Sequence, residues 1–195
     1  MKINILLFDK FETLDAFGPA EIFGKVQEFE LDYFSVEGGI VTSSQNVSIV
    51  TKPITEAKDD CVWLIPGGEG TRCLVHDEDF LLKLKQLAQK SKFCLSVCTG
   101  AALLAKCGVL DGIRATSNKR AFDWVKTTSQ KTLWVKKARW VAAGKFYTSS
   151  GVSAGMDMAL GFVSDILGKN KANEIAKRIE YVRNDDPEKD DFSEN

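Results

Sequence analysis

The sequence predicts an α/β fold in which helices cover both faces of a mostly parallel sheet. Apolar runs of strand length alternate along the chain with stretches of helical periodicity, which is the pattern of such a sheet. The apolar run at residues 93–97 also passes directly into a helical segment at 101–107, with Cys98 at the corner. Such a strand-to-helix corner projects its side chain above the sheet.

The composition describes an ordinary globular protein of one domain. The chain has 195 residues, of which 44% are hydrophobic and 27% are charged, and its formal net charge is -1. Because there is no basic excess, nucleic acid and anionic membranes are not expected partners. The apolar start meets Asp9 and Lys10 too early for a signal peptide, and no later run reaches membrane-spanning length, so we expect a cytoplasmic protein.

The cysteines indicate a reducing compartment and no metal site. Five of them, an odd number, are scattered without a C-x-x-C pair in a chain too large to need disulfide staples. Cys94 and Cys98 are four apart along a predicted strand, and the only histidine, His76, lies in a polar segment without ligand spacing. We therefore expect no metal and no other cofactor.

The first third of the chain is predicted to contain strands and one helix. Residues 2–8 form an apolar strand, and Gly18-Pro19 opens a helix at 19–29 because proline is favoured in the first helical turn. Polar residues separate two short strands, and Pro66-Gly67-Gly68 ends the last strand of this part. The further strands are predicted at residues 31–36, 40–42, 47–51 and 61–65.

The middle of the chain places helices around the strand at 93–97. Apolar residues at helical spacing predict an amphipathic helix at 77–89, and Gly108 ends the compact helix at 101–107. A polar turn at Asp111-Gly112 then precedes the segment 114–117 and a short helix around residues 122–125.

The last part predicts a hairpin, two helices and a tail. Residues 139–143 and 146–149 flank Ala-Gly-Lys as a hairpin. Ser153 caps a helix that runs to about Leu167, and a second helix is predicted at 171–182.

We expect residues 1–184 to form a single domain. Residues 185–195 are acidic, contain Pro187 and are expected to be a disordered tail.

Four loops leave the carboxyl ends of predicted strands, where ligands bind in an open α/β sheet. Asp15 follows the first strand, and the glycine loop with Gly67 and Gly68 follows the strand at 61–65. Cys98 follows its own strand, and the hairpin leads into a loop with Ser150 and Gly151. These loops therefore supply the candidate site residues.

Cys98 is the candidate nucleophile. Free N–H groups at the start of the following helix favour a thiolate and any anion formed beside it. The N–H groups of Gly68 and Thr99 are expected to form an oxyanion hole. The proton carrier is expected to be a carboxylate, Asp15 or Glu21, because the single histidine lies elsewhere in the sequence.

Short motifs follow one another in a fixed order along the chain. They are Leu14-Asp15-x-x-Gly18-Pro19-x-Glu21-x-Phe23, Pro66-Gly67-Gly68-x-Gly70-Thr71-Arg72, Val97-Cys98-Thr99-Gly100-Ala101, Ala115-Thr116 and Gly151-Val152-Ser153-Ala154-Gly155-Met156-Asp157. Together they resemble the ThiJ/PfpI superfamily, cysteine-bearing relatives of class I glutamine amidotransferases, from residue 2 to about residue 182. The resemblance implies a flavodoxin-like three-layer sandwich and a homodimer.

Within that superfamily the chain is most similar to the isonitrile hydratase branch. Members of that branch pair the elbow cysteine with an aspartate and a following threonine, which implies roles for Cys98, Asp15 and Thr99. Other branches place a glutamate against the cysteine, which keeps Glu21 as the alternative. The chain departs from the branch at Asn118, where the branch commonly has a Thr-His-Trp type of sequence.

The resemblance implies a small-molecule cysteine enzyme. The leading hypothesis is the addition of water to an isonitrile, which gives an N-substituted formamide through a thioimidate on Cys98. The alternatives are glyoxalase-type or amidase-type chemistry, or a non-catalytic redox or ligand sensor. No helix-turn-helix pattern follows Val182, so direct DNA binding is not expected.

Overall fold

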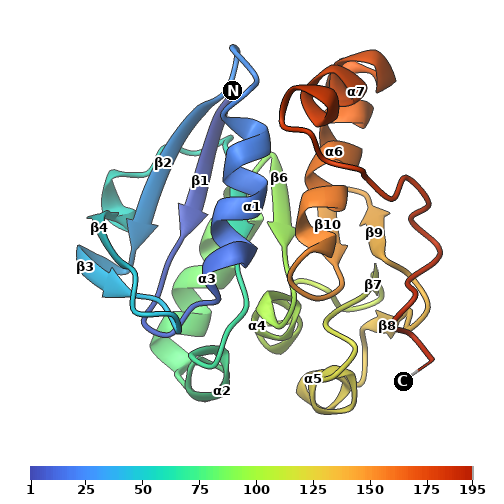
Figure 1. The fold of residues 1–195 in the computed structure, drawn as a ribbon. Coiled ribbons are helices and arrows are strands. Elements are labelled where there is room, and N and C mark those ends of the chain that lie inside the picture. The colour runs from blue at the N-terminus through green and yellow to red at the C-terminus, as the bar shows by residue number, and fades with distance from the viewer. Residues whose placement is uncertain (195) are drawn as a thin grey trace.

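The computed structural model describes residues 1–194, which contain a central eight-stranded sheet (Figure 1). From β4 to β10 all neighbouring strands run parallel, whereas β3 and β9 pair antiparallel at the two edges. In sheet order the strands are β3 (Glu37–Thr42), β4 (Ser48–Pro53), β2 (Glu30–Ser35), β1 (Lys2–Leu6), β5 (Val62–Ile65), β6 (Phe93–Ser96), β10 (Phe146–Ser149) and β9 (Trp140–Ala143). A separate pair is formed by β7 (Arg114–Ala115) and β8 (Leu133–Trp134).

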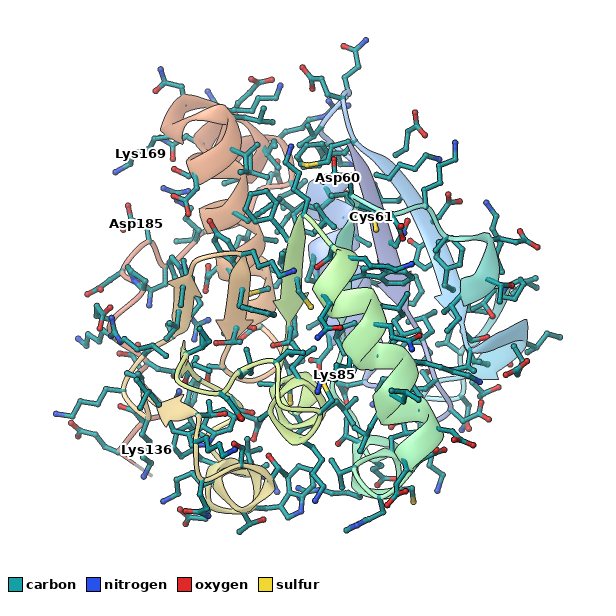
Figure 2. The ribbon with its side chains drawn as sticks, turned by 180° about the vertical axis from the view of Figure 1, so that it is seen from behind. Asp60, Cys61, Lys85, Lys136, Lys169 and Asp185 are labelled. Carbon is teal, nitrogen blue, oxygen red and sulfur yellow. The ribbon has the colours of Figure 1, made fainter. Side chains whose placement is uncertain are left out.

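Helices cover both faces of the sheet, which confirms the predicted flavodoxin-like sandwich. α1 packs against α6 on one face, and α3 lies on the opposite face, as Figures 1 and 2 show from the two sides. The helices are α1 (Thr13–Phe23), α2 (Thr71–Leu74), α3 (Glu78–Lys90), α4 (Gly100–Lys106), α5 (Phe122–Thr128), α6 (Ala154–Leu167) and α7 (Lys169–Arg178), with a 3-10 turn at Ile54–Glu56. Within residues 1–194, no helix combines the length and the hydropathy that crossing a bilayer requires.

The central strands form the core. Every residue of β5 is buried, because helices cover both faces of a parallel sheet and both sets of side chains must be apolar. The carboxyl ends of β1, β5 and β6 point to the end of the sheet where α2 and α4 lie (Figure 1). The loops predicted to carry the site therefore meet at one end of the molecule.

The first helix begins earlier than the proline signal predicts. α1 starts at Thr13 and contains Pro19 in its interior, and the chain after Phe23 continues as turns, so the prediction of a helix at 19–29 is wrong at both ends. Pro19 removes only the hydrogen bond that would reach the carbonyl of Asp15. The first turn also makes hydrogen bonds with distant segments, from Thr13 to Gln45 and from the Gly67 N–H to Asp15. As a result, Asp15 lies in a helical turn and not in a loop.

The bounds of α6 agree with the prediction, whereas those of α7 differ from it. Ser153 occupies the N-cap position of α6, but its side chain makes no cap hydrogen bond. α7 ends at Arg178, four residues before the predicted end at Val182. The Tyr181 hydroxyl instead donates a hydrogen bond of 3.0 Å to Asp157, so tertiary contacts take over where the helix stops.

Residues 185–194, for which the sequence predicts disorder, lie against β9 in the structure. The N–H of Arg139 donates to the carbonyl of Pro187 at 2.8 Å, and the N–H of Asp190 donates to the carbonyl of Lys137 at 2.9 Å. The Asp190 side chain is buried. Asn195, the last residue of the predicted tail, lies outside the described residues.

A buried cluster of charges anchors this segment. Arg139 Nε donates to Asp157 Oδ2 at 2.7 Å, and Arg139 Nη1 lies 3.8 Å from Asp190 Oδ1. Asp190 Oδ2 also lies 3.9 Å from the buried Lys119 Nζ. A buried carboxylate keeps its charge most readily when cationic partners of this kind surround it. The charge cluster therefore ties α6, the start of β9 and the C-terminal segment together.

We predict that Asp157→Ala lowers the free energy of unfolding by about 3–5 kcal/mol, because Arg139 would be left buried without its closest carboxylate. Asp185→Ala is the matched control in the C-terminal segment. Asp185 pairs at 3.5 Å with Lys169 on the surface (Figure 2), and such a pair contributes less than about 1 kcal/mol. Urea unfolding of both variants measures the difference, and equal losses would contradict an anchoring role.

Candidate active site

Cys98 occupies a strained corner between β6 and α4. Its φ of 56° lies in the left-handed region, which non-glycine residues rarely adopt. Two hydrogen bonds hold the strained peptide units. The Cys98 N–H donates to the carbonyl of Ser150 at 3.0 Å, and Ser117 Oγ donates to the carbonyl of Cys98 at 2.6 Å. This geometry is the nucleophile elbow that the sequence predicts.

Gly100 permits the corner to approach the neighbouring strand. A Cβ atom at this position would lie 2.8 Å from the carbonyl oxygen of Pro66 and would overlap the carbonyl oxygen of Ile65. The loop after β5 and the first turn of α4 are therefore in direct backbone contact. This contact brings the glycine loop beside Cys98.

Asp15 is fully buried beside the thiol. Its Oδ2 accepts a hydrogen bond of 2.9 Å from the N–H of Gly67, and its Oδ1 has no hydrogen-bond partner among the described residues. Burial raises the pKa of Asp15 to about 7, and the hydrogen bond from the Gly67 N–H opposes this shift. The negative charge of Glu12 raises the pKa further, and the hydrogen bond with the Cys98 thiol lowers it. Asp15 is thus poised to exchange a proton near neutral pH.

Burial also raises the pKa of the Cys98 thiol well above its usual range, and the neighbouring Asp15 charge raises it further. Three donors oppose the shift, namely the N–H groups of Thr99 and Val152 and the side chain of Asn118. The thiol therefore keeps its proton at rest. The structure thus places a protonated thiol beside a buried carboxyl group whose pKa is about 7.

Thr99 holds the glycine loop and makes no hydrogen bond with Asp15. Its Oγ1 accepts from the N–H of Gly68 at 3.0 Å and from the Thr71 hydroxyl at 3.1 Å. The Gly68 N–H is therefore already engaged, which contradicts its predicted place in an oxyanion hole. The N–H groups of Thr99 and Val152, with Asn118, are the donors that face the sulfur. Thr99 positions Asp15 only indirectly, through the loop that contains Gly67.

Asn118 owes its orientation to a helix start. Its Oδ1 accepts a hydrogen bond of 3.0 Å from the N–H of Ala121, which assigns the oxygen to that side and leaves Nδ2 to face Cys98. A Cβ at Gly151 would lie only 2.5 Å from Nδ2, so this glycine makes room for the amide. The residue that departs from the branch pattern therefore lies directly at the thiol.

The alternative carboxylate, Glu21, and the single histidine, His76, both lie apart from the thiol. Glu21 is exposed on α1 and forms an ion pair of 2.7 Å with Lys25. His76 is exposed just before α3. The structure thus brings Asp15 to Cys98, and it places neither Glu21 nor His76 there.

Arg72 also lies near the thiol, and the sequence motif that contains it gave no indication of this position. Its guanidinium stacks 3.4 Å above the centroid of the Trp124 ring, between α2 and α5. Partial burial lowers the pKa of Arg72, and the nearby Cys98 opposes that shift. The motif names Arg72, but nothing in the sequence pairs it with Trp124.

A cavity of about 600 Å³ lies next to residues that surround the thiol, although Cys98 itself is not part of its wall. It begins at Asn118 and Val152, which both contact Cys98, and its wall includes Ser150 and Gly151. Its size suits a small organic molecule. A thiol, a buried carboxyl group and three hydrogen-bond donors thus meet at the carboxyl end of the sheet, next to a cavity of small-molecule size.

Comparisons with known proteins identify the family of this chain. The family model described as the DJ-1/PfpI family matches residues 1–165. The chain belongs to the DJ-1/PfpI family. It is 30% identical over 186 residues to the isonitrile hydratase of Pseudomonas putida, which covers 93% of this chain and 79% of that protein.

Two further relatives show the range of the DJ-1/PfpI family. A crystal structure of a THiJ/PfpI family protein from Pseudomonas syringae matches with a TM-score of 0.82 and 26% identity, over 94% of this chain and 76% of that chain. The HTH-type transcriptional regulator CdhR of Pseudomonas aeruginosa is 25% identical over 181 residues. That alignment covers 89% of this chain but only 53% of the regulator.

We predict that Asp15→Asn becomes more stable relative to the wild type as the pH rises. The pKa of Asp15 is about 7 in the folded chain and about 4 in the unfolded chain. Between about pH 4 and pH 7 the Asp15 carboxyl group is therefore protonated in the folded state and ionised in the unfolded state, so the wild type loses stability as the pH rises across this range. The difference in unfolding free energy should grow by about 4 kcal/mol from pH 4 to pH 8. Denaturation at several pH values measures it, with the exposed Asp79→Asn as control. A constant difference would contradict the raised pKa.

Proposed function

We propose that this DJ-1/PfpI family protein is an isonitrile hydratase-like enzyme, which converts an isonitrile and water into an N-substituted formamide. The observation that carries the proposal is the buried pair of Cys98 and Asp15, with no histidine beside the thiol. The similarity to the isonitrile hydratase of Pseudomonas putida supports the same reaction class.

In the first step, the Cys98 sulfur attacks the terminal carbon of the isonitrile. The ionised Asp15 takes the thiol proton as the carbon–sulfur bond forms, and then delivers that proton to the same carbon. The product of this step is a thioimidate on Cys98. The Thr99 and Val152 N–H groups stabilise negative charge that develops at the sulfur and the attached carbon.

In the second step, water replaces the sulfur. Asp15, again ionised, accepts a proton from water as the oxygen bonds to the thioimidate carbon, and passes this proton to the imine nitrogen. The carbon–sulfur bond then breaks, the proton of the new hydroxyl group moves to the Cys98 sulfur, and the N-substituted formamide leaves. One water is consumed for each isonitrile, so the cycle needs no cofactor.

A sensor role is the alternative, and the similarity to the regulator CdhR favours it. Oxidation by peroxide requires a thiolate, and burial raises the pKa of Cys98 so that little thiolate is present at rest. We therefore prefer the enzyme. Selective oxidation of Cys98 by mild peroxide, detected by mass spectrometry in a protein without turnover of isonitriles or glyoxal, would favour the sensor.

The homodimer that the family resemblance implies stays a prediction, which light scattering tests.

We predict that Cys98→Ala abolishes the hydration of cyclohexyl isonitrile, because no other thiol stands at the elbow. Formamide formation by the wild type and the variant measures the effect. Cys73→Ala is the matched control, since Cys73 is a free, exposed cysteine at α2. Turnover that survives in Cys98→Ala would refute the covalent route.

We predict that Asp15→Asn lowers kcat about a hundredfold or more, because the amide accepts no proton from the thiol. In the wild type, kcat/KM should fall about tenfold per pH unit below a pKa of about 7, where Asp15 becomes protonated. The pH profile of formamide formation measures this pKa. A profile that is flat between pH 5 and 8 would exclude Asp15 as the base.

A further inference from the structure

The cavity beside Cys98 is lined by an excess of basic side chains. Figure 1 shows α5, β8 and the C-terminal segment around this part of the molecule. Asp123 is the one carboxylate in the described wall of the cavity. The basic residues of the wall are Lys119, Arg120, Lys136 and Arg139.

Two of these basic residues are neutralised within the protein. The buried Lys119 faces Asp190 at 3.9 Å, and Arg139 binds Asp157 at 2.7 Å. Lys119 also donates to the carbonyl of Ala138 at 2.7 Å, so its ammonium group is fully engaged. These two cations are parts of the charge cluster and hold the C-terminal segment in place.

Two basic residues of the wall remain available. Arg120 and Lys136 are exposed, and neither forms an ion pair with any carboxylate of residues 1–194. Asp123 does not neutralise them, because it pairs with Lys126 at 3.1 Å. The mouth of the cavity thus carries uncompensated positive charge.

The same cavity has an apolar side. Phe122 of α5, Val152 of the loop before α6 and Phe192 of the C-terminal segment contribute to its wall. A ligand that fits both sides combines an apolar body with one anionic group. A cavity of about 600 Å³ is large enough for such a molecule together with its reactive carbon at Cys98.

We infer that the substrate is an organic anion, whose carboxylate binds Arg120 and Lys136 while its apolar body lies against Phe122 and Phe192 and its reactive carbon reaches Cys98. This inference rests on the proposed function for the reaction at Cys98, and it adds the class of substrate. Charge-assisted hydrogen bonds to Arg120 and Lys136 would supply the selectivity.

The test compares two aryl isonitriles that differ only in charge, one with a para carboxylate and one with a para methyl group. The wild type should show a kcat/KM about tenfold or more higher for the carboxylate, and added salt should reduce this ratio. Arg120→Gln and Lys136→Gln should each lower the ratio several-fold. Lys137→Gln is the matched control, because it removes the same charge from the adjacent exposed residue outside this cavity and should leave the ratio unchanged.

The outcomes separate this inference from the proposed function. Turnover of both isonitriles with equal kcat/KM, or an equal loss of the ratio in Lys137→Gln, would overturn the inference and leave the reaction in place. If neither isonitrile is turned over, calorimetry with the para-carboxyphenyl and para-methylphenyl formamides tests binding alone. If the wild type binds the para-carboxyphenyl formamide more tightly and Arg120→Gln weakens that binding, the anion site is supported although the proposed reaction has failed. If the two formamides bind equally, or neither binds, the anion site is overturned.

Discussion

The left-handed backbone at Cys98 is the constraint on which the site depends. A strand of the central sheet turns into a helix within the three residues between Ser96 and Gly100, and hydrogen bonds from Ser117 and to Ser150 hold Cys98 in that conformation. Because the corner is closed, the N–H of Thr99 points at the sulfur and Gly100 touches the loop after β5. A relaxed backbone would lose both contacts, so the strain at one residue organises the nucleophile and its surroundings together.

Burial at this corner gives the site its chemistry and also destabilises the fold. Asp15 has one backbone donor and no exposure, so its charged form is costly and its pKa moves to about 7. The same burial keeps the Cys98 thiol protonated. In the proposed reaction, transfer of the proton from the Cys98 thiol to Asp15 activates the sulfur. The glycine loop keeps Asp15 in place for that step, because the Gly67 N–H donates to Asp15 and the Gly68 N–H donates to Thr99.

The C-terminal segment extends the site beyond the sheet. Asp190 is bound to the charge cluster, and Phe192 two residues later contributes to the wall of the cavity next to the thiol. The charge cluster thus has two effects. It neutralises the charges of Lys119 and Arg139, and it leaves the charges of Arg120 and Lys136 unpaired for a ligand. An acidic composition alone gives no sign of this, because one buried carboxylate with two cationic neighbours suffices to hold a polar segment.

The sequence by itself determined the alternation of strands and helices and the corner at Cys98, because these depend on local periodicity and on a motif within one short stretch. The pairing of that cysteine with Asp15 was implied only by the family resemblance, with Glu21 as the alternative, and the tertiary structure places Asp15 beside the thiol. Only the tertiary structure decided that α1 begins before Pro19, that Thr99 captures the Gly68 N–H, and that Asn118 faces the sulfur. It also decided that residues 185–194 pack against β9. The physical reason is that hydrogen-bond partners and burial are set between segments far apart in the chain, where neither propensity nor spacing carries information.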